Sequence, residues 1–207
     1  LTGPSITSLQ PGNYTCITTD SNNCKTTSPF VITEPTAPFA NITSTNSTIC
    51  ELDASGQINT YLLNGQVISL YGFSWSDNSA GGSFNPPTGS LNPIYTPPSP
   101  PPTTPIIITL TADGDPSIPC PDDFDDITLT IIPAPISDAG TGSTICKGGS
   151  YTLDGEATND NGLSWDDDGV GGTFTPPNSE DPTYTPPAWY TGNITITLTV
   201  YGMIPCT

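Results

Sequence analysis

The chain contains one long sequence pattern twice. Residues 74–98 read SWSDNSAGGSFNPPTGSLNPIYTPP, and residues 164–187 read SWDDDGVGGTFTPPNSEDPTYTPP. The tetrapeptide STIC precedes each copy, and the tripeptide IPC follows it. A repeat of about 90 residues matches the size of one small β-sandwich and exceeds that of a solenoid unit. The repeat therefore predicts two copies of one small domain.

The repeat divides the chain into three segments. We place the first copy at 37–134 and the second at 135–207. Residues 1–36 are expected to be the C-terminal part of another immunoglobulin-like repeat, because LQPGNYTC resembles a tyrosine corner, with Tyr14 two residues before Cys16. The first copy continues into DDFDDITLTII, a strand without a counterpart in the second. Either the chain is a window from a longer one, or neighbouring subunits supply the missing strands by β-augmentation.

Both copies have the pattern of short strands. Apolar residues and Thr alternate over 194–200, so one face of that strand is expected to be buried and the other solvated. The 25 Pro and 20 Gly favour strands and turns over helices. We therefore expect an all-β fold of tandem immunoglobulin-like antiparallel β-sandwiches. Trp75 and Trp165 are the expected core anchors; stacking on a ligand is the alternative.

The chain has six cysteines and no histidine. Without His, the common zinc sites and the Ser-His or Cys-His nucleophile pairs are unavailable. Six widely spaced cysteines predict three disulfides formed in an oxidising compartment. Bonds Cys50–Cys120 and Cys146–Cys206 would each join an early and a late strand of the same copy. Each would close a loop of roughly 60–70 residues and stabilise the copy by about 4 kcal/mol.

The net charge is −18, from twenty acidic and two basic residues. Such a surface repels phosphate, so we expect no nucleic-acid partner. Anionic membranes are disfavoured for the same reason, and no apolar run is long enough for membrane insertion. Divalent cations, in contrast, would be attracted.

Clustered aspartates are the candidate metal ligands. Calcium binds six to eight oxygen atoms, which loops at the end of a sandwich can supply. Solvated acidic loops are the alternative, because no cluster matches an EF-hand or an RTX repeat. The first copy has Ser-Asp-Asn where the second has three Asp, so such a site need not recur. The candidate calcium ligands are Asp122, Asp123, Asp125, Asp126, Asp166, Asp167 and Asp168.

Catalysis is not expected. Paired carboxylates can hydrolyse glycosides, but no His, no basic clamp and no acid within an apolar run accompanies them. Trp189 and Tyr190, after the second YTPP, are the best candidates for contact with a sugar ligand. The first copy has prolines and threonines there, so this feature is not shared.

Two ordered motifs resemble known surface proteins. Residues Leu9 to Cys24 fit LxPGxYxCxxTDxNxC, which resembles the end of the repeat in giant gliding-motility adhesins of the SprB type. The series STIC…W…GG(S/T)F…PxYTPP…ITLT…C, followed once by DDITLTI, resembles the PKD-like repeats of giant Bacteroidetes surface proteins. This resemblance implies export by type IX secretion to the bacterial cell surface. It also pairs Cys16 with Cys24; a partner for Cys16 on a missing upstream strand is the alternative.

Three functions follow from these observations. The first is a stalk or spacer of an adhesin in surface adhesion and gliding motility, with neighbouring repeats as its partners. The second is a subunit of an extracellular filament joined to other subunits by β-strand donation. The third is a carbohydrate-binding module of a secreted polysaccharide-degrading enzyme, with a surface polysaccharide as its ligand.

Overall fold

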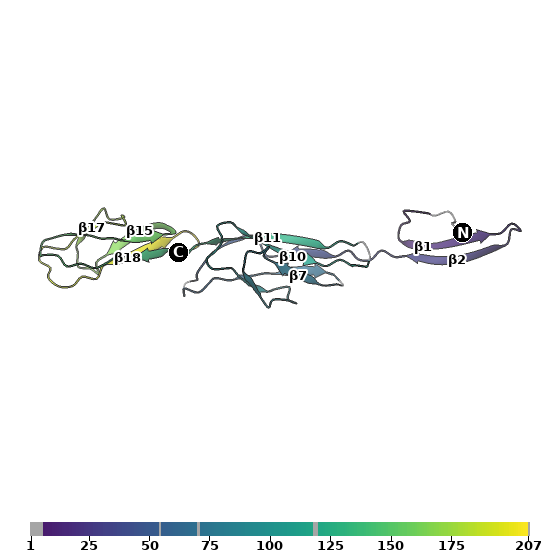
Figure 1. The fold of residues 1–207 in the computed structure, drawn as a ribbon, viewed down its shortest axis with the longest axis horizontal. Coiled ribbons are helices and arrows are strands. Elements are labelled where there is room, and N and C mark those ends of the chain that lie inside the picture. The colour runs from purple at the N-terminus through teal and green to yellow at the C-terminus, as the bar shows by residue number, and fades with distance from the viewer. Residues whose placement is uncertain (1–5, 54, 70, 118–119, 207) are drawn as a thin grey trace. The chain divides into compact units, whose positions relative to one another are not determined.

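Strands and turns make up the described structure, and the all-β prediction is confirmed (Figure 1). The computed structural model describes residues 6–53, 55–69, 71–117 and 120–206, and no helix occurs among them. The chain divides into two compact units, Leu1–Ala37 and Pro38–Thr207. The second unit contains both copies of the repeat.

The N-terminal unit is an antiparallel hairpin of β1 (Gly12–Thr19) and β2 (Lys25–Ile32). The Asp20 carboxylate closes its turn, because it accepts hydrogen bonds from the N–H groups of Asn22 and Cys24 at 2.8 and 2.9 Å. Aspartate favours turns through such side-chain to backbone bonds.

The tyrosine corner predicted in this unit is confirmed. The Tyr14 hydroxyl donates a hydrogen bond of 2.6 Å to the carbonyl oxygen of Gln10, four residues upstream. The Tyr14 ring also stacks on Phe30 of β2, with ring centroids 5.5 Å apart. These two contacts tie the start of the hairpin to its second strand.

The predicted Cys16–Cys24 disulfide is wrong. Both cysteines are free and exposed. Cys16 lies opposite Ser28 in the hairpin, four residues beyond Cys24. Four residues of extended chain span about 13 Å, whereas disulfide-bonded Cα atoms lie within about 7 Å.

The first copy consists of short strands around one four-stranded sheet. These strands are β3 (Phe39–Ile42), β4 (Ser47–Cys50), β5 (Tyr61–Leu62), β6 (Gly65–Ile68), β7 (Phe73–Ser76), β8 (Ser83–Asn85), β9 (Ile94–Thr96), β10 (Ile106–Ala112) and β11 (Asp123–Ile132). The main sheet has the order β4-β11-β10-β7, and smaller sheets pair β3 with β6 and β9 with both β5 and β8. β3 packs against β10 and β11.

The core of this copy follows from the period-two pattern of β10 and β11. In β10, Ile106, Ile108 and Leu110 are at most 2 % exposed, whereas the intervening Ile107 and Thr109 point away from the core. β11 buries Ile127 and Leu129 in the same cluster. Because alternate side chains share one face of a strand, both strands turn their apolar side to the core.

One pairing departs from the antiparallel expectation. β4 runs parallel to β11, with Cys50 opposite Ile132. Parallel neighbours require a long crossover, and here the strands β5 to β10 lie between them in the chain. This pairing places Cys50 at the C-terminal end of β11.

The second copy repeats most of these strands. They are β12 (Ile136–Asp138), β13 (Tyr151–Thr152), β14 (Glu156–Thr158), β15 (Asp160–Asp166), β16 (Thr173–Thr175), β17 (Thr183–Thr185) and β18 (Thr197–Gly202). The pairs β12-β14 and β15-β18 and the sheet β13-β17-β16 correspond to β3-β6, β7-β10 and β5-β9-β8. Trp165 is 8 % exposed in its core, which also contains Leu163 and Leu198.

Two strands of the main sheet have no counterpart within the described residues of the second copy. Residues 143–146 carry the STIC motif but form no strand, unlike β4. Among the residues that the structure describes, β18 pairs with β15 alone, whereas β10 pairs with both β7 and β11. β18 is also shorter at its start than β10. β10 begins at Ile106, which aligns with residue 194, whereas β18 begins only at Thr197.

Candidate functional site

A buried carboxylate explains why the second copy carries both the GG and the YTPP motifs. Asp167 follows Trp165 by two residues and is 7 % exposed. One of its oxygens accepts hydrogen bonds from the Gly172 N–H at 2.6 Å and from the Tyr184 hydroxyl at 2.9 Å. The repeated motifs therefore converge on one carboxylate.

The first copy contains the same cluster. Asp77 accepts hydrogen bonds from the Gly82 N–H at 2.8 Å and from the Tyr95 hydroxyl at 3.0 Å. Only glycine fits beside the tyrosine, because a Cβ atom at Gly82 would lie 2.2 Å from the Tyr95 hydroxyl oxygen, and one at Gly172 would lie 2.4 Å from that of Tyr184. The long repeated motif thus encodes a packing and hydrogen-bonding unit.

In this cluster the pKa values of Asp167 and Tyr184 are shifted in opposite directions, both away from neutral pH. Burial and the hydrogen bond to Asp167 raise the pKa of Tyr184 to about 12. Burial alone would raise the pKa of Asp167, but hydrogen bonds from Gly172, Tyr184 and Gly171 outweigh it and hold that pKa below the usual range. Around neutral pH the carboxylate stays charged and the phenol stays protonated, so the pair is not poised for acid–base catalysis.

The aspartates at 122–126, predicted as calcium ligands, hold strands together instead. Asp123 and Asp125 accept hydrogen bonds from backbone N–H groups of β3 at 2.9 and 2.8 Å. Asp126 accepts one from the Thr109 hydroxyl on β10, and Asp122 from a glycine N–H after β10. Since successive side chains of a strand point to opposite faces, Asp126 lies on the other face of β11 from Asp123 and Asp125.

The aspartates at 166–168 are likewise divided. Asp167 points into the core, while Asp166 and Asp168 are exposed and Asp166 accepts the N–H of Asp168 at 2.8 Å. In the described ranges, no group of three Asp, Glu, Cys or His side chains is placed to hold a metal ion. A comparison of the two acidic clusters as wholes did not reveal the aspartate that the copies share. That aspartate can be found in the sequence as the residue two positions after each Trp.

A disulfide joins the two copies. It links Cys50, at the end of β4, to Cys206, with Cα atoms 4.9 Å apart and a sequence separation of 156. The Cys206 sulfur also lies 3.4 Å from the carbonyl oxygen of Ile132. In the chain-entropy model, closing so long a loop stabilises the folded state by about 5 kcal/mol.

The predicted bonds Cys50–Cys120 and Cys146–Cys206 are therefore wrong. Cys120 and Cys146 are free. Cys50 lies beside the last residue of β11, whereas Cys120 precedes its first residue. Ten residues of strand separate the two ends by about 30 Å, far beyond disulfide reach. The sequence prediction joined an early strand to a late strand of the same copy. It lacked the parallel pairing of β4 with β11, which places Cys50 and Cys120 at opposite ends of β11.

The candidate sugar-contacting aromatics lie between β17 and β18. Trp189 is 72 % exposed, and its ring meets that of Tyr190 edge-on at a centroid distance of 5.8 Å. The Tyr190 hydroxyl donates to the carbonyl oxygen of Asn193 at 2.8 Å. This loop thus presents one exposed indole ring rather than an extended aromatic surface.

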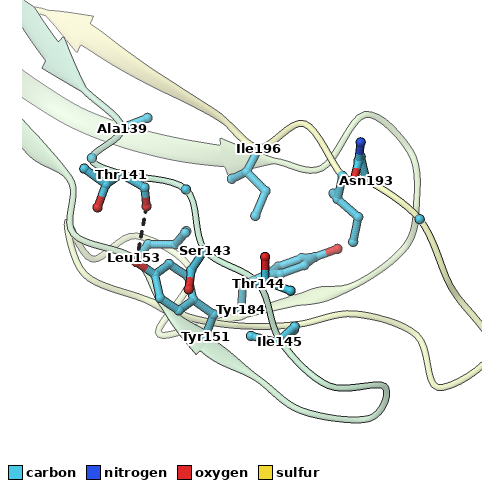
Figure 2. A pocket seen from close by; sticks show the side chains of 14 residues that line it. Ala139, Thr141, Ser143, Thr144, Ile145, Tyr151, Leu153, Tyr184, Asn193 and Ile196 are labelled. Carbon is cyan, nitrogen blue, oxygen red and sulfur yellow. Dashed lines mark hydrogen bonds between the residues drawn. The ribbon is translucent and has the colours of Figure 1, made fainter.

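An open groove lies where the second copy lacks strands. Its volume is about 410 Å³. Figure 2 shows segment 139–145 on one side, Ile196 and Asn193 on the other, and the Tyr184 ring between them. A hydrogen bond of 3.2 Å from the Tyr151 hydroxyl to the Thr141 carbonyl oxygen borders it.

No family model and no curated protein matches this chain. A solved structure of Drosophila OTK, extracellular domains 3–5, is similar to it at a TM-score of 0.39 and 10% identity, over 93% of this chain and 70% of that one. That similarity is too low to carry an argument about function. No described helix is long and apolar enough to cross a membrane.

Proposed function

We propose that this chain is a non-catalytic spacer region of a bacterial cell-surface adhesin or filament, exported by type IX secretion and working in surface adhesion and gliding motility. The disulfide between Cys50 and Cys206 is the observation that carries the spacer role. Disulfides persist in oxidising environments, which supports a place outside the cytoplasm. The resemblance of the repeats to gliding adhesins supports the cellular role.

The position of this disulfide suits a part that bears load. Cys50 lies near the start of the first copy and Cys206 near the end of the second. A force that pulls on the two ends of the Pro38–Thr207 unit would pass through the covalent bond. Residues 51–205, which contain the core of the second copy and all but the β3 and β4 residues of the first core, would lie outside the path of the force.

Single-molecule force spectroscopy tests this role. Handles at residues 38 and 207 would pull the oxidised chain, and then the same chain after reduction. Reduction should release about 55 nm of additional contour length, since an extended residue spans about 3.5 Å. Equal contour lengths before and after reduction would contradict the spacer mechanism, and a Cys206→Ser variant should match the reduced chain without any reductant.

A further inference from the structure

We propose that the groove of the second copy is an acceptor site for a β-strand with the chemistry of residues 122–132. Such a strand has an acidic first half and alternates Ile or Leu with Thr in its second half. It would lie between segment 143–146 and β18. This inference goes beyond the spacer role and does not depend on it.

The first copy shows what fills the equivalent position. There β11 lies between β4 and β10 in the main sheet. It pairs in parallel with the STIC motif of β4 and antiparallel with β10. In the second copy the STIC motif and β18 both remain, and the cavity lies between segment 139–145 and residues 192–196, which directly precede β18.

The apolar wall of the groove is unfinished. Ile106 and Ile108 of the first copy are 2 % and 0 % exposed, and they lie opposite Leu129 and Ile127 of the neighbouring β11. Their counterparts, Ile194 and Ile196, are only partly buried and line the groove. A strand that placed Ile or Leu against them would complete the core as β11 does in the first copy.

The backbone beside the groove is also unpaired on one side. Residues 106–108 of β10 pair with β11 and not with β7, which pairs only from Thr109 onward. The counterpart segment 194–196 forms no strand. Unpaired strand edges are templates for β-augmentation, so an added strand should extend β18 back to residue 194.

The acidic half of the proposed strand also has a place. In the first copy, Asp123 of β11 accepts a hydrogen bond from the N–H of Ala40 on β3. Ser137 of β12 corresponds to Ala40, since each pairs opposite the residue two positions after the glycine that contacts the core Trp. Its N–H lies on the strand that would receive an equivalent carboxylate.

A synthetic peptide with the sequence of residues 122–132, DDFDDITLTII, tests the proposal in trans. The matched control peptide carries the changes I127N, L129N and I131N. On binding, hydrogen exchange at amides 194–196 and 143–146 should slow at least ~10-fold, because these groups gain sheet partners. The control peptide should require at least ~10-fold higher concentration to produce the same slowing of exchange. Equal effects of the two peptides would overturn the proposal.

Two variants of the chain refine the test. Ile196→Asn places an amide in the groove and should weaken peptide binding at least ~10-fold. Thr195→Asn is the control, because Thr195 is exposed and does not line the groove, and it should leave binding unchanged. Equal binding by both variants would count against the groove as the site.

A tethered variant covers the case of weak binding in trans. Adding residues 122–132 directly after residue 207 reproduces the two-residue spacing between Cys120 and β11. The same amides should become protected without any peptide. The proposal would be overturned if exchange in this variant were unchanged. It would also be overturned if protection arose only in a concentration-dependent dimer of the unmodified chain. Neither result would alter the outcome of the force experiment on the disulfide.

Discussion

The Tyr184 hydroxyl donates a hydrogen bond of 2.9 Å to the Asp167 carboxylate, and Tyr95 donates one of 3.0 Å to Asp77. In each copy the aspartate follows the strand of the core Trp, and the tyrosine lies in a strand of a different sheet. Each pair therefore connects two sheets across the core.

Removing one hydroxyl group should destabilise the second copy. Tyr184→Phe leaves the buried Asp167 carboxylate without one of its donors, and hydrogen bonds to charged groups contribute about 1.5–3 kcal/mol. Urea unfolding followed by near-UV circular dichroism would measure the loss. Tyr201→Phe is the control, because Tyr201 is 52 % exposed and bonds only to the Ser164 hydroxyl. A loss no larger than that of the control would contradict the account.

Acid should weaken the second copy through Asp167. Its pKa in the folded state lies below the ordinary carboxyl value, so its stabilising contribution is present above about pH 4 and disappears as the pH falls through the folded pKa. Asp167→Asn should therefore make the free energy of unfolding less dependent on pH between about 4 and 2. The measurement is urea unfolding across that range; parallel curves for both proteins would refute the assignment.

Adding one methyl group to the GG motif should disrupt the Asp167 cluster. In Gly172→Ala the new Cβ atom would lie 2.4 Å from the Tyr184 hydroxyl oxygen, and overpacking costs about 1–3 kcal/mol. Gly142→Ala is a suitable control, since no atom lies within 4 Å of a Cβ atom there. Thermal unfolding should separate the two variants, and equal midpoints would argue against the close approach.

Loss of the exposed indole should change neither stability nor glycan binding. Trp189→Ala removes a side chain that is 72 % exposed, and substitutions at such positions usually change stability by about 0.5 kcal/mol or less. Affinity electrophoresis with bacterial polysaccharides would measure binding. If the unmodified chain bound a polysaccharide and the Trp189→Ala variant did not, the carbohydrate-binding alternative would be favoured over a spacer.

The repeated motif made much of this fold predictable from sequence. Trp165 is buried in its core, and Trp75 is partly buried and packs against its core. Each donates its indole N–H to a serine carbonyl oxygen, of Ser179 and Ser90 respectively. The alternating pattern at 194–200 predicted a strand that forms only from Thr197 onward, where it buries Leu198. These features depend on residues close in sequence, which single-chain patterns report well.

The sequence was a poorer guide to long-range pairing. Strand partners depend on topology, and the parallel alignment of β4 with β11 moved Cys50 away from Cys120 and toward Cys206. Local sequence also did not reveal that Asp123 and Asp125 of β11 accept hydrogen bonds from backbone groups of β3, some eighty positions away. No local pattern encodes either contact.

Disulfide mapping under non-reducing conditions tests the central claim most directly. The chain would be alkylated to block free thiols, digested with pepsin at acid pH to prevent exchange, and analysed by mass spectrometry. The account predicts one cross-linked peptide pair that contains Cys50 and Cys206. Peptide pairs that join Cys50 to Cys120 and Cys146 to Cys206 would show that each copy is closed on itself, and would contradict a covalent bond between the copies.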